Sequence, residues 1–343
     1  YRLEQQFVIE RGDDPPYSLI DPDPLSIPPC LMGVQLDAEN SIYLCDNITD
    51  KLIKIGPDGR EQFAVGSRGE GPEDHADAGE PLFWPGSGIA RSDCSAAPKV
   101  ILYDEAGGFL RSIKFGGYDQ VNRVWVAGDQ VVAVAADMDG TPISGVKVQS
   151  YLLTLQSDGT VMQSIPVRQA EIPPMGLEQV PHETDFEIIP RVAVDSGGNI
   201  YLQRDLYRYA VECYDADLTL RWTCERDVPT PKWSDEEFAQ RRAEREPYVE
   251  AHEYRHVIRR IVPGADGTVW VERTEQEAAP GSVLLDRIGA DGEYRGQAEV
   301  TGLPKVAGEY LIFGDRLLWK VDDDAEVGEA DIPYLVVYRL VRV

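Results

Sequence analysis

The hexapeptide AHEYRH, Ala251–His256, holds the residue types and the spacing of a zinc site. Two histidines four positions apart, His252 and His256, share one face of a helix and can bind the metal, while Glu253 serves as general base. That chemistry needs a long helix, uncharged residues at the two central positions and a third ligand further along. Arg255 occupies one central position. We therefore interpret His252, Glu253 and His256 as a chance match and predict no metal ligands here.

Two further segments have compositions that could bind a ligand. The glycine-rich segment GSRGEGPED (Gly66–Asp74) resembles a phosphate cradle, but it lacks the Gly-Lys-Ser/Thr ending of a P-loop and carries acidic residues that repel phosphate. The acidic segment Val321–Asp331 lacks the spacing of a calcium loop. We predict a connecting turn for the first and a solvated loop for the second. The four histidines and the serines suggest no catalytic triad.

The five cysteines form no CxxC pair and show no metal-ligand spacing, which argues against a zinc ribbon or an iron-sulfur centre. Cys30 and Cys45 are the disulfide candidate, because both fall near the open end of one expected hairpin. Cys213 and Cys224 lie on neighbouring expected strands but out of register. An odd number of cysteines leaves at least one thiol without an intramolecular bridge.

Charge excludes one class of partner. The chain has 33 basic and 60 acidic residues, a formal net charge of -27, and the acidic residues are spread along its length. Nucleic-acid binding is not expected, because such proteins present a basic footprint to the phosphates. No apolar run reaches the roughly 18 residues of a membrane span. The chain begins at Tyr1 without a hydrophobic leader, so we expect a mature, exported product, periplasmic or extracellular.

One sequence pattern recurs along the chain: an apolar strand, an acidic or glycine turn, and then Ile or Val followed by an aromatic residue. Clear copies are VQLDAENSIYLCD (Val34–Asp46), VAVDSGGNIYLQRD (Val192–Asp205) and RIVPGADGTVWVER (Arg260–Arg273). Each predicts an antiparallel hairpin, and most copies are followed by a second hairpin with its own Asp-Gly or Asp-Ala turn. Pairs of hairpins predict four-stranded sheets, the blades of a propeller.

We therefore predict an all-β fold, a single domain over residues 1–343 that forms a six-bladed β-propeller. The alternatives are seven blades or a two-sheet sandwich, and the strands of the second blade, near Phe83–Phe115, are ambiguous. Residues 1–10 form a strand with no blade of its own, while Tyr334–Val343 leaves the last blade one strand short. Pairing these two segments would close the ring and remove an open sheet edge.

One segment breaks the β pattern. Residues 233–255 contain Ser234 followed three positions later by Glu237, a capping box, and then a run of good helix formers. We predict a helical insertion between blades four and five. Its aromatic residues Trp233, Phe238 and Tyr248 are the candidate partner contacts, because exposed aromatic side chains often anchor interfaces. Packing of the helix onto the propeller is the competing interpretation for all three.

These features together resemble the bacterial six-bladed β-propeller proteins related to the NHL-repeat family. The segment Ser41–Arg60 is similar to one NHL repeat unit, and Gly66–Asp74 is similar to the glycine-rich segment that follows it. The resemblance implies an exported protein, often a lipoprotein, although Tyr1 is not a lipid-modified cysteine. It specifies architecture and not chemistry.

The sequence thus favours a non-catalytic binding or interaction propeller with a protein partner and no cofactor, as an accessory subunit or scaffold of a membrane-associated complex. Peripheral membrane association would come through the partner or a lost lipid anchor. The alternative is a calcium-dependent, lactonase-like hydrolase that holds the metal at the mouth of the central channel with oxygens from several blades. No set of residues can be assigned to that site from spacing.

Overall fold

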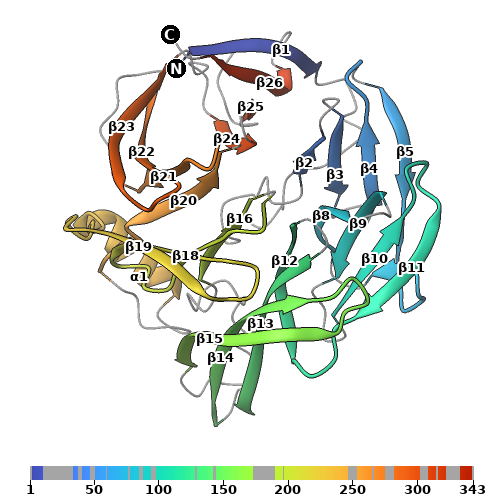
Figure 1. Cartoon of the computed structure of the whole chain (residues 1–343), viewed down its shortest axis with the longest axis horizontal. Helices are drawn as coiled ribbons and strands as arrows, with labels where there is room; N and C mark the ends of the chain where they lie inside the picture. Colours follow the sequence, from blue (N-terminus) through green and yellow to red (C-terminus); the bar gives the residue numbers. More distant parts are fainter. Residues whose placement is uncertain are drawn as a thin grey trace.

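The computed structural model describes most of the 343-residue chain. The described residues are 2–10, 34–37, 41–46, 51–58, 60–75, 78–84, 88–93, 98–127, 130–141, 144–172, 190–195, 197–245, 253–264, 266–274, 282–301, 308–313, 316–321 and 333–341. Within them the chain forms β-strands almost throughout, and the sheets are arranged as a ring (Figure 1). This is an all-β propeller fold, as the sequence predicted.

Four sheets have four strands each, in which consecutive strands pair antiparallel. The first contains β2 (Val34–Leu36), β3 (Ile42–Asp46), β4 (Lys51–Ile55) and β5 (Glu61–Val65). The second contains β8 (Ala78–Trp84), β9 (Gly88–Asp93), β10 (Lys99–Tyr103) and β11 (Phe109–Lys114). The third contains β12 (Gln120–Ala127), β13 (Gln130–Thr141), β14 (Gly145–Leu155) and β15 (Val161–Ile172). The fourth contains β16 (Arg191–Val194), β17 (Ile200–Gln203), β18 (Tyr209–Tyr214) and β19 (Leu220–Arg226).

The remaining large sheet has eight strands in the order β20-β21-β22-β23-β1-β26-β25-β24. Its strands are β20 (Ile258–Pro263), β21 (Val269–Arg273), β22 (Ser282–Ile288), β23 (Tyr294–Thr301), β24 (Gly308–Phe313), β25 (Arg316–Val321), β26 (Pro333–Val341) and β1 (Arg2–Glu10). The chain therefore forms five large sheets among its described residues, and not six separate ones as predicted. The difference arises because β1 touches both halves of this sheet.

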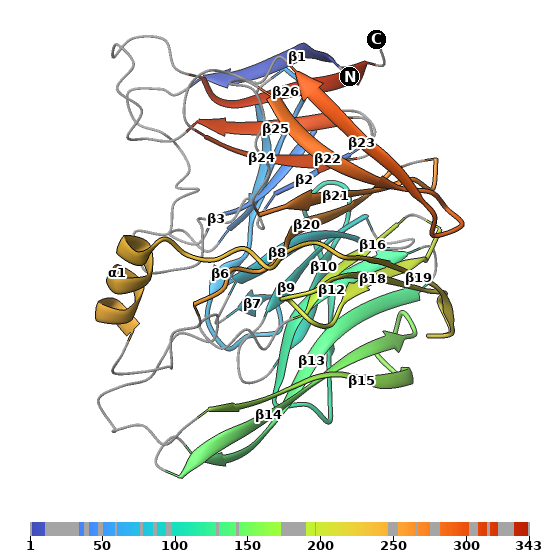
Figure 2. The ribbon, with the colours of Figure 1, turned by 90° about the vertical axis from the view of Figure 1, so that its left-hand side faces the viewer.

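The predicted pairing of the chain ends is confirmed. β1 runs antiparallel to β26 from the pair Arg2 and Val341 to the pair Glu10 and Pro333. Its contact with β23 is parallel and consists of one residue pair, Arg2 with Thr301. The two termini accordingly lie side by side at the edge of the ring (Figures 1 and 2).

Most predicted hairpins have the expected turns. In the hairpin of β16 and β17 the Asp195 carboxylate accepts hydrogen bonds from the backbone N–H groups of Gly197, at 2.9 Å, and Asn199, at 2.8 Å. The Asp-Gly turn between β22 and β23 requires glycine, because Gly292 has a φ of 82° and a Cβ atom there would lie 2.7 Å from the Trp222 ring. In the ambiguous second blade, the segment that includes β10 and β11 supplies the third and fourth strands.

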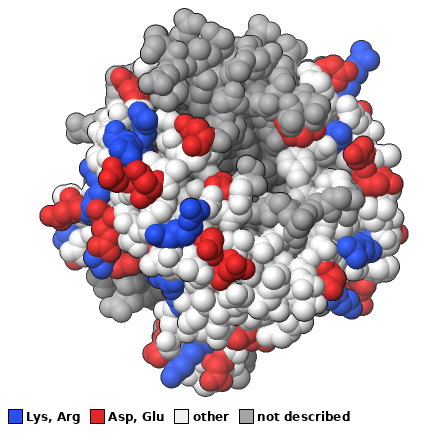
Figure 3. Space-filling view, viewed as in Figure 1, with Lys and Arg blue, Asp and Glu red and all other residues white. Residues whose placement is uncertain are grey.

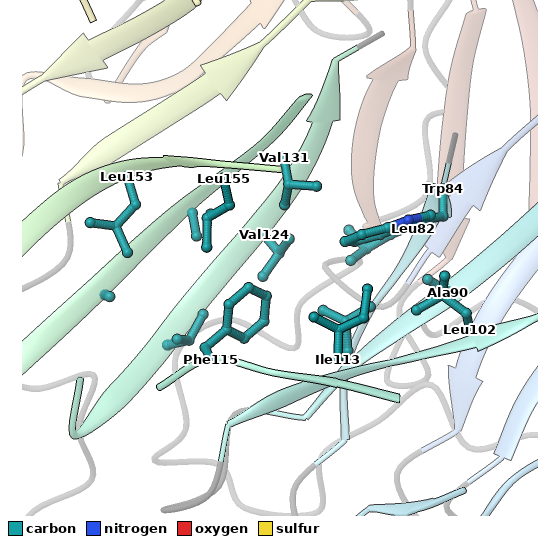
Figure 4. Close-up of a cluster of buried hydrophobic side chains, with 14 residues drawn as sticks. Leu82, Trp84, Ala90, Leu102, Ile113, Phe115, Val124, Val131, Leu153 and Leu155 are labelled. Atoms are coloured by element: carbon teal, nitrogen blue, oxygen red, sulfur yellow. The ribbon is translucent and has the colours of Figure 1, made fainter. Parts of the chain in front are cut away.

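The core lies between neighbouring sheets, which explains why some strands are apolar on both faces. On β13, Val131 and Ala133 pack toward the β8–β11 sheet, whereas Val132 and Val134 pack toward the β16–β19 sheet. Alternate residues of a strand point to opposite faces, so a sheet between two others buries both. Figure 4 shows the first of these clusters, in which Leu82, Trp84, Leu102, Val124 and Leu153 come from two sheets.

We call β2, β8, β12, β16, β20 and β24 the inner strands. Each is the first of four successively paired strands and lies at the edge of that group. Along the chain each inner strand contacts the one that follows it, beginning with β2 and β8 and finishing with β20 and β24. The inner strands therefore surround the centre of the ring (Figure 1).

The helix α1 (Asp235–Arg245) lies between β19 and β20 in the chain. It is shorter than the predicted segment 233–255, of which residues 246–252 lie outside the described residues. Among the described residues, no helix combines the length and the apolar character that a membrane crossing requires.

Candidate functional site: the α1 segment and the inner-strand arginines

The predicted capping box begins α1 as the sequence indicated. The Ser234 hydroxyl accepts a hydrogen bond from the Glu237 backbone N–H at 3.2 Å, and the Glu237 carboxylate accepts one from the Ser234 backbone N–H at 3.0 Å. The backbone N–H and the hydroxyl of Ser234 both donate to the Glu237 carboxylate and lower its pKa, and the nearby Arg255 guanidinium acts in the same direction. The start of the helix is thus fixed by residues of the segment itself.

The two ends of the α1 segment are also joined to each other. Lys232 and Tyr254 form an isolated antiparallel bridge, and the Trp233 backbone N–H donates to the Glu253 carbonyl at 3.1 Å. The Arg255 guanidinium lies 4.2 Å from the centre of the Trp233 ring and 2.6 Å from a Glu237 carboxylate oxygen. One arginine therefore links the helix start to the returning chain.

Two of the three predicted partner contacts, Trp233 and Phe238, lie within the described residues. Trp233 and Phe238 are partly exposed. Because the Arg255 guanidinium lies over its ring, Trp233 serves packing within the segment at least in part. Tyr248 lies outside the described residues. Figure 2 shows α1 standing clear of the sheets at one end of the molecule.

The part of the HExxH motif that the structure describes is not helical. Residues 253–256 form a bend and the bridge of Tyr254, and His252 lies outside the described residues. The exposed Glu253 carboxylate pairs with Lys232 at 3.2 Å. Among the described residues, no three His, Cys, Asp or Glu side chains are grouped closely enough for a metal ion.

The glycine-rich segment Gly66–Asp74 connects two sheets. Asp74 accepts a hydrogen bond from the Gly71 backbone N–H at 3.0 Å, and the Gly71 carbonyl accepts one from the Lys99 ammonium at 2.9 Å. The next residue, His75, is fully buried with its Nε2 atom 2.8 Å from Arg91 Nη1. This segment connects β5 and β8, as predicted, and it contains two short strands that pair parallel, β6 (Ser67–Arg68) and β7 (Asp74–His75).

The cysteine predictions have different outcomes. Cys45 is buried on β3, and its predicted partner Cys30 lies outside the described residues, so the bridge stays a prediction. Cys213 and Cys224 are free, buried thiols and are out of register as predicted, because Cys224 pairs with Val211. The acidic segment Val321–Asp331 lies outside the described residues after Val321.

The most unusual charge arrangement lies on three consecutive inner strands and was not predicted. Arg123, Arg191 and Arg260 belong to β12, β16 and β20, respectively. Each stands three residues before a corresponding pair near the hairpin turn, namely Val126 with Val131, Val194 with Ile200 and Pro263 with Val269. The three arginines therefore occupy equivalent positions of the repeat. Neighbouring inner strands contact each other, so these positions share one sector of the ring.

The arginines of this cluster have different contacts. Glu272, on β21 opposite Arg260, receives Arg259 Nη1 at 3.1 Å and lies 3.8 Å from Arg260 Nε. Arg191 instead points an Nη2 hydrogen at the Nδ1 atom of His256, 3.1 Å away. A guanidinium can only donate hydrogen bonds, so Nδ1 is the acceptor in this contact.

The surroundings of Arg191 disfavour the positive charge of its guanidinium group. Burial lowers the pKa of Arg191 to about 10, and the positive charges of Arg123 and Arg260 act in the same direction, opposed by the Glu272 carboxylate. Its Nε atom is buried and has no hydrogen-bond partner among the described residues. The sequence carries one signal of this arrangement, because RVWV, RVAV and RIVP repeat the same pattern, but the pattern alone does not place the three arginines on neighbouring strands.

No protein-family model matches the chain, and no curated protein matches it. Among solved structures it is similar to the calcium-binding protein regucalcin from Agrobacterium tumefaciens, with 12% identity over 99% of this chain and 94% of that chain and a TM-score of 0.42. It is also similar to a streptogramin B lyase, with 12% identity over 91% and 83% and a TM-score of 0.45. A third is the PQQ-bound aldose sugar dehydrogenase from Streptomyces coelicolor, with 12% identity over 98% and 97% and a TM-score of 0.46.

These neighbours are β-propeller proteins with different activities. Because the sequence identities and TM-scores are this low, no activity of these proteins can be assigned to this chain. The fold assignment rests on the chain's own sheets and core.

Proposed function

We propose that this chain is a non-catalytic binding propeller that presents the α1 segment to a protein partner. The single observation that carries the proposal is the way α1 is held. A capping box, a backbone bridge and the Arg255 contacts fix a short helix that stands clear of the sheets. A pre-organised element loses little conformational freedom on binding, which favours recognition.

The chemistry of the α1 segment suggests the kind of partner. Asp235, Glu236 and Glu237 make the first turn acidic and are exposed, and the whole chain carries a net charge of -27. Phe238 follows them with a partly exposed ring. We infer a partner with a basic docking surface and an apolar site for one aromatic ring. Over the face shown in Figure 3, acidic and basic side chains are interspersed.

We also infer that the ring functions with six blades. The eight-stranded sheet divides naturally into β20–β23 and a second run of β24, β25, β26 and β1, because β1 meets β23 at one residue pair only. Inner strands begin each of the two runs and touch each other. The N-terminal strand would then complete the last blade by pairing with β26.

The resemblance also supports an exported protein, periplasmic or extracellular. We further propose that it acts as an accessory subunit or scaffold of a membrane-associated complex. Fractionation of the native cells tests the location directly. Recovery of the protein in the cytoplasmic fraction would contradict it.

The partner is tested by crosslinking the full-length protein in its native envelope and identifying bound proteins by mass spectrometry. We expect one polypeptide to be recovered in a fixed ratio with the wild type and lost with Phe238→Ala. Phe109→Ala is the matched control, because Phe109 is an exposed aromatic residue on the outer strand β11. Equal recovery with Phe238→Ala and wild type would contradict a partner site on α1.

A further inference from the structure

We propose that His75 and Arg91 form an acid-sensitive latch, which holds the segment Ser67–His75 against the β8–β11 sheet and releases it when the imidazole is protonated. The segment contains β6 and β7 and lies in the chain between the first two four-stranded sheets. The inference begins from two fully buried side chains in direct contact. It does not depend on the partner proposed for α1.

The first step concerns the contact itself. His75 Nε2 lies 2.8 Å from Arg91 Nη1, and both residues are 0% exposed. A guanidinium donates hydrogen bonds and cannot accept them, so Nε2 is the acceptor and carries no proton. Both ring nitrogens of an imidazolium carry protons, and the hydrogen bond is therefore lost once His75 is protonated. The contact is compatible only with the neutral ring.

The second step concerns the charges around the ring. Protonation of His75 would bring a second cation into contact with Arg91 in a buried site, where like charges repel strongly. Two carboxylates oppose this repulsion. Asp74 is partly exposed, so water screens it, and Asp93 on β9 is paired with the Lys99 ammonium at 3.9 Å. The direct contact with the guanidinium therefore decides the sign of the effect.

Two further ionisable groups belong to the same surroundings. Glu73 is exposed, and its backbone carbonyl accepts a hydrogen bond from the Tyr103 hydroxyl at 3.5 Å. Burial raises the pKa of Tyr103 to about 12, and the positive charge of Arg91 acts in the opposite direction. Tyr103 is therefore uncharged in neutral and acidic solution, and it adds no anion that would stabilise an imidazolium.

The third step concerns what the latch holds. The Gly69 backbone N–H donates to the His75 carbonyl at 3.1 Å, and Arg68 pairs with His75 where β6 and β7 run parallel. The Lys99 ammonium donates to the Gly71 carbonyl at 2.9 Å. His75 thus joins the internal pairing of the segment to the buried guanidinium of β9. A segment this short can open locally while the sheets of the ring stay folded.

The fourth step gives the pH window. The latched segment binds no proton on His75 Nε2, whereas the open segment exposes a histidine with an ordinary pKa of about 6.5. Opening therefore becomes more favourable as the pH falls below that value. Hydrogen bonds from the Ser67 hydroxyl and the Gly71 backbone N–H lower the pKa of Asp74 below 3.8. The stabilising contribution of Asp74 is lost only in that lower range, so the two effects are separable.

The test is hydrogen exchange of the full chain at pH 7.5 and pH 5.5, corrected for intrinsic rates and measured by mass spectrometry. We expect peptides covering Ser67–His75 to exchange about ten-fold faster at pH 5.5, the factor for uptake of one proton by an ordinary histidine. Peptides of β10 should change less than about two-fold. His75→Gln should remove the pH response, because its amide oxygen can accept from Arg91 at either pH.

His256→Gln is the matched control, because His256 also has an arginine at its ring, Arg191 at 3.1 Å, and lies outside the segment. It should keep the wild-type pH response of Ser67–His75. If His75→Gln does not fold, nitrogen NMR of labelled histidines in the wild type decides the question, because protonation of His75 must accompany the faster exchange. The proposal is overturned by equal wild-type exchange at the two pH values, by an unchanged response in His75→Gln, or by faster exchange without protonation of His75.

Discussion

Two buried carboxylates among the described residues are compensated by arginines. Asp286 has no exposed surface and receives Arg226 Nη1 at 2.5 Å and Arg273 Nε at 3.3 Å. Glu272 likewise has two arginines within 4 Å. Two arginines differ from these carboxylates. The fully buried Arg91 has the His75 ring 2.8 Å away, and Arg191 has the His256 ring 3.1 Å away. A ring compensates the burial of a guanidinium less than a carboxylate does.

Thiol reactivity follows from burial at single residues. Burial raises the pKa of the Cys213 thiol to about 11 and that of Cys224 above its usual range. The thiolate is the reactive form, and two pKa units reduce its population about a hundred-fold at pH 8. We expect Cys213 and Cys224 to resist iodoacetamide in the native protein and to react at once in denaturant, as mapped by mass spectrometry of the peptides.

The same labelling tests the predicted Cys30–Cys45 bridge. If it forms, both cysteines stay unlabelled in denaturant until a reductant is added, whereas Cys213 and Cys224 react without one. Labelling of Cys30 and Cys45 in denaturant alone would contradict the bridge. Rapid native labelling of Cys213 would contradict the burial argument.

At the scale of elements, α1 is an isolated helix of 11 residues, too short to be stable alone. Its order depends on local devices, namely the capping box and the Arg255 contacts. The propeller strands are different, because each has paired neighbours and apolar residues packed against the next sheet. Changes at the cap should therefore alter the helix and leave the rest of the protein unaffected.

We expect Ser234→Ala and Glu237→Gln to increase amide exchange of residues 235–245 by roughly two- to thirty-fold, with no change in global thermal unfolding. The matched control is Glu236→Gln, which removes an exposed charge from the same turn without a role in the capping box. Exchange-detected mass spectrometry measures both. Unchanged exchange in Ser234→Ala would show that the cap does not hold the helix.

The pH dependence of α1 has a definite sign. The folded-state pKa of Glu237 lies below its ordinary value of 4.5. Its stabilising contribution is therefore complete above that value and is lost as the pH falls through the lowered pKa. Helix exchange, corrected for intrinsic rates, should increase in that window for the wild type but not for Glu237→Gln.

At the scale of the whole molecule, ring closure depends on the two chain ends. β1 pairs with β26 along nearly its full length and covers an edge that would otherwise present unpaired backbone groups. A propeller without this strand has an open edge and fewer sheet hydrogen bonds. Closure is thus a long-range contact between the first and last strands of the chain.

Deleting residues 1–10 should lower the thermal unfolding temperature by several degrees or more and promote aggregation. A synthetic peptide of residues 1–10 should restore part of the loss by strand addition, whereas a scrambled peptide should not. Differential scanning calorimetry measures both effects. An unchanged unfolding temperature would contradict closure by β1 and the inferred sixth blade.

The sequence by itself determined the strands, their turns and the pairing of the ends. Period-two apolar patterns and Asp-based turns are local signals, so hairpins such as β16 and β17 were predictable residue by residue. The capping box of α1 is equally local, and it was found from Ser234 and Glu237 alone.

Only the tertiary structure decided how β1 joins two runs of strands and which arginines meet. Arg123, Arg191 and Arg260 are more than 60 residues apart in sequence. They share a sector only because inner strands of successive sheets come together around one centre. A repeat pattern indicates equivalent positions, but distances between repeats depend on packing between sheets. That packing creates the arginine cluster, and no local pattern specifies it.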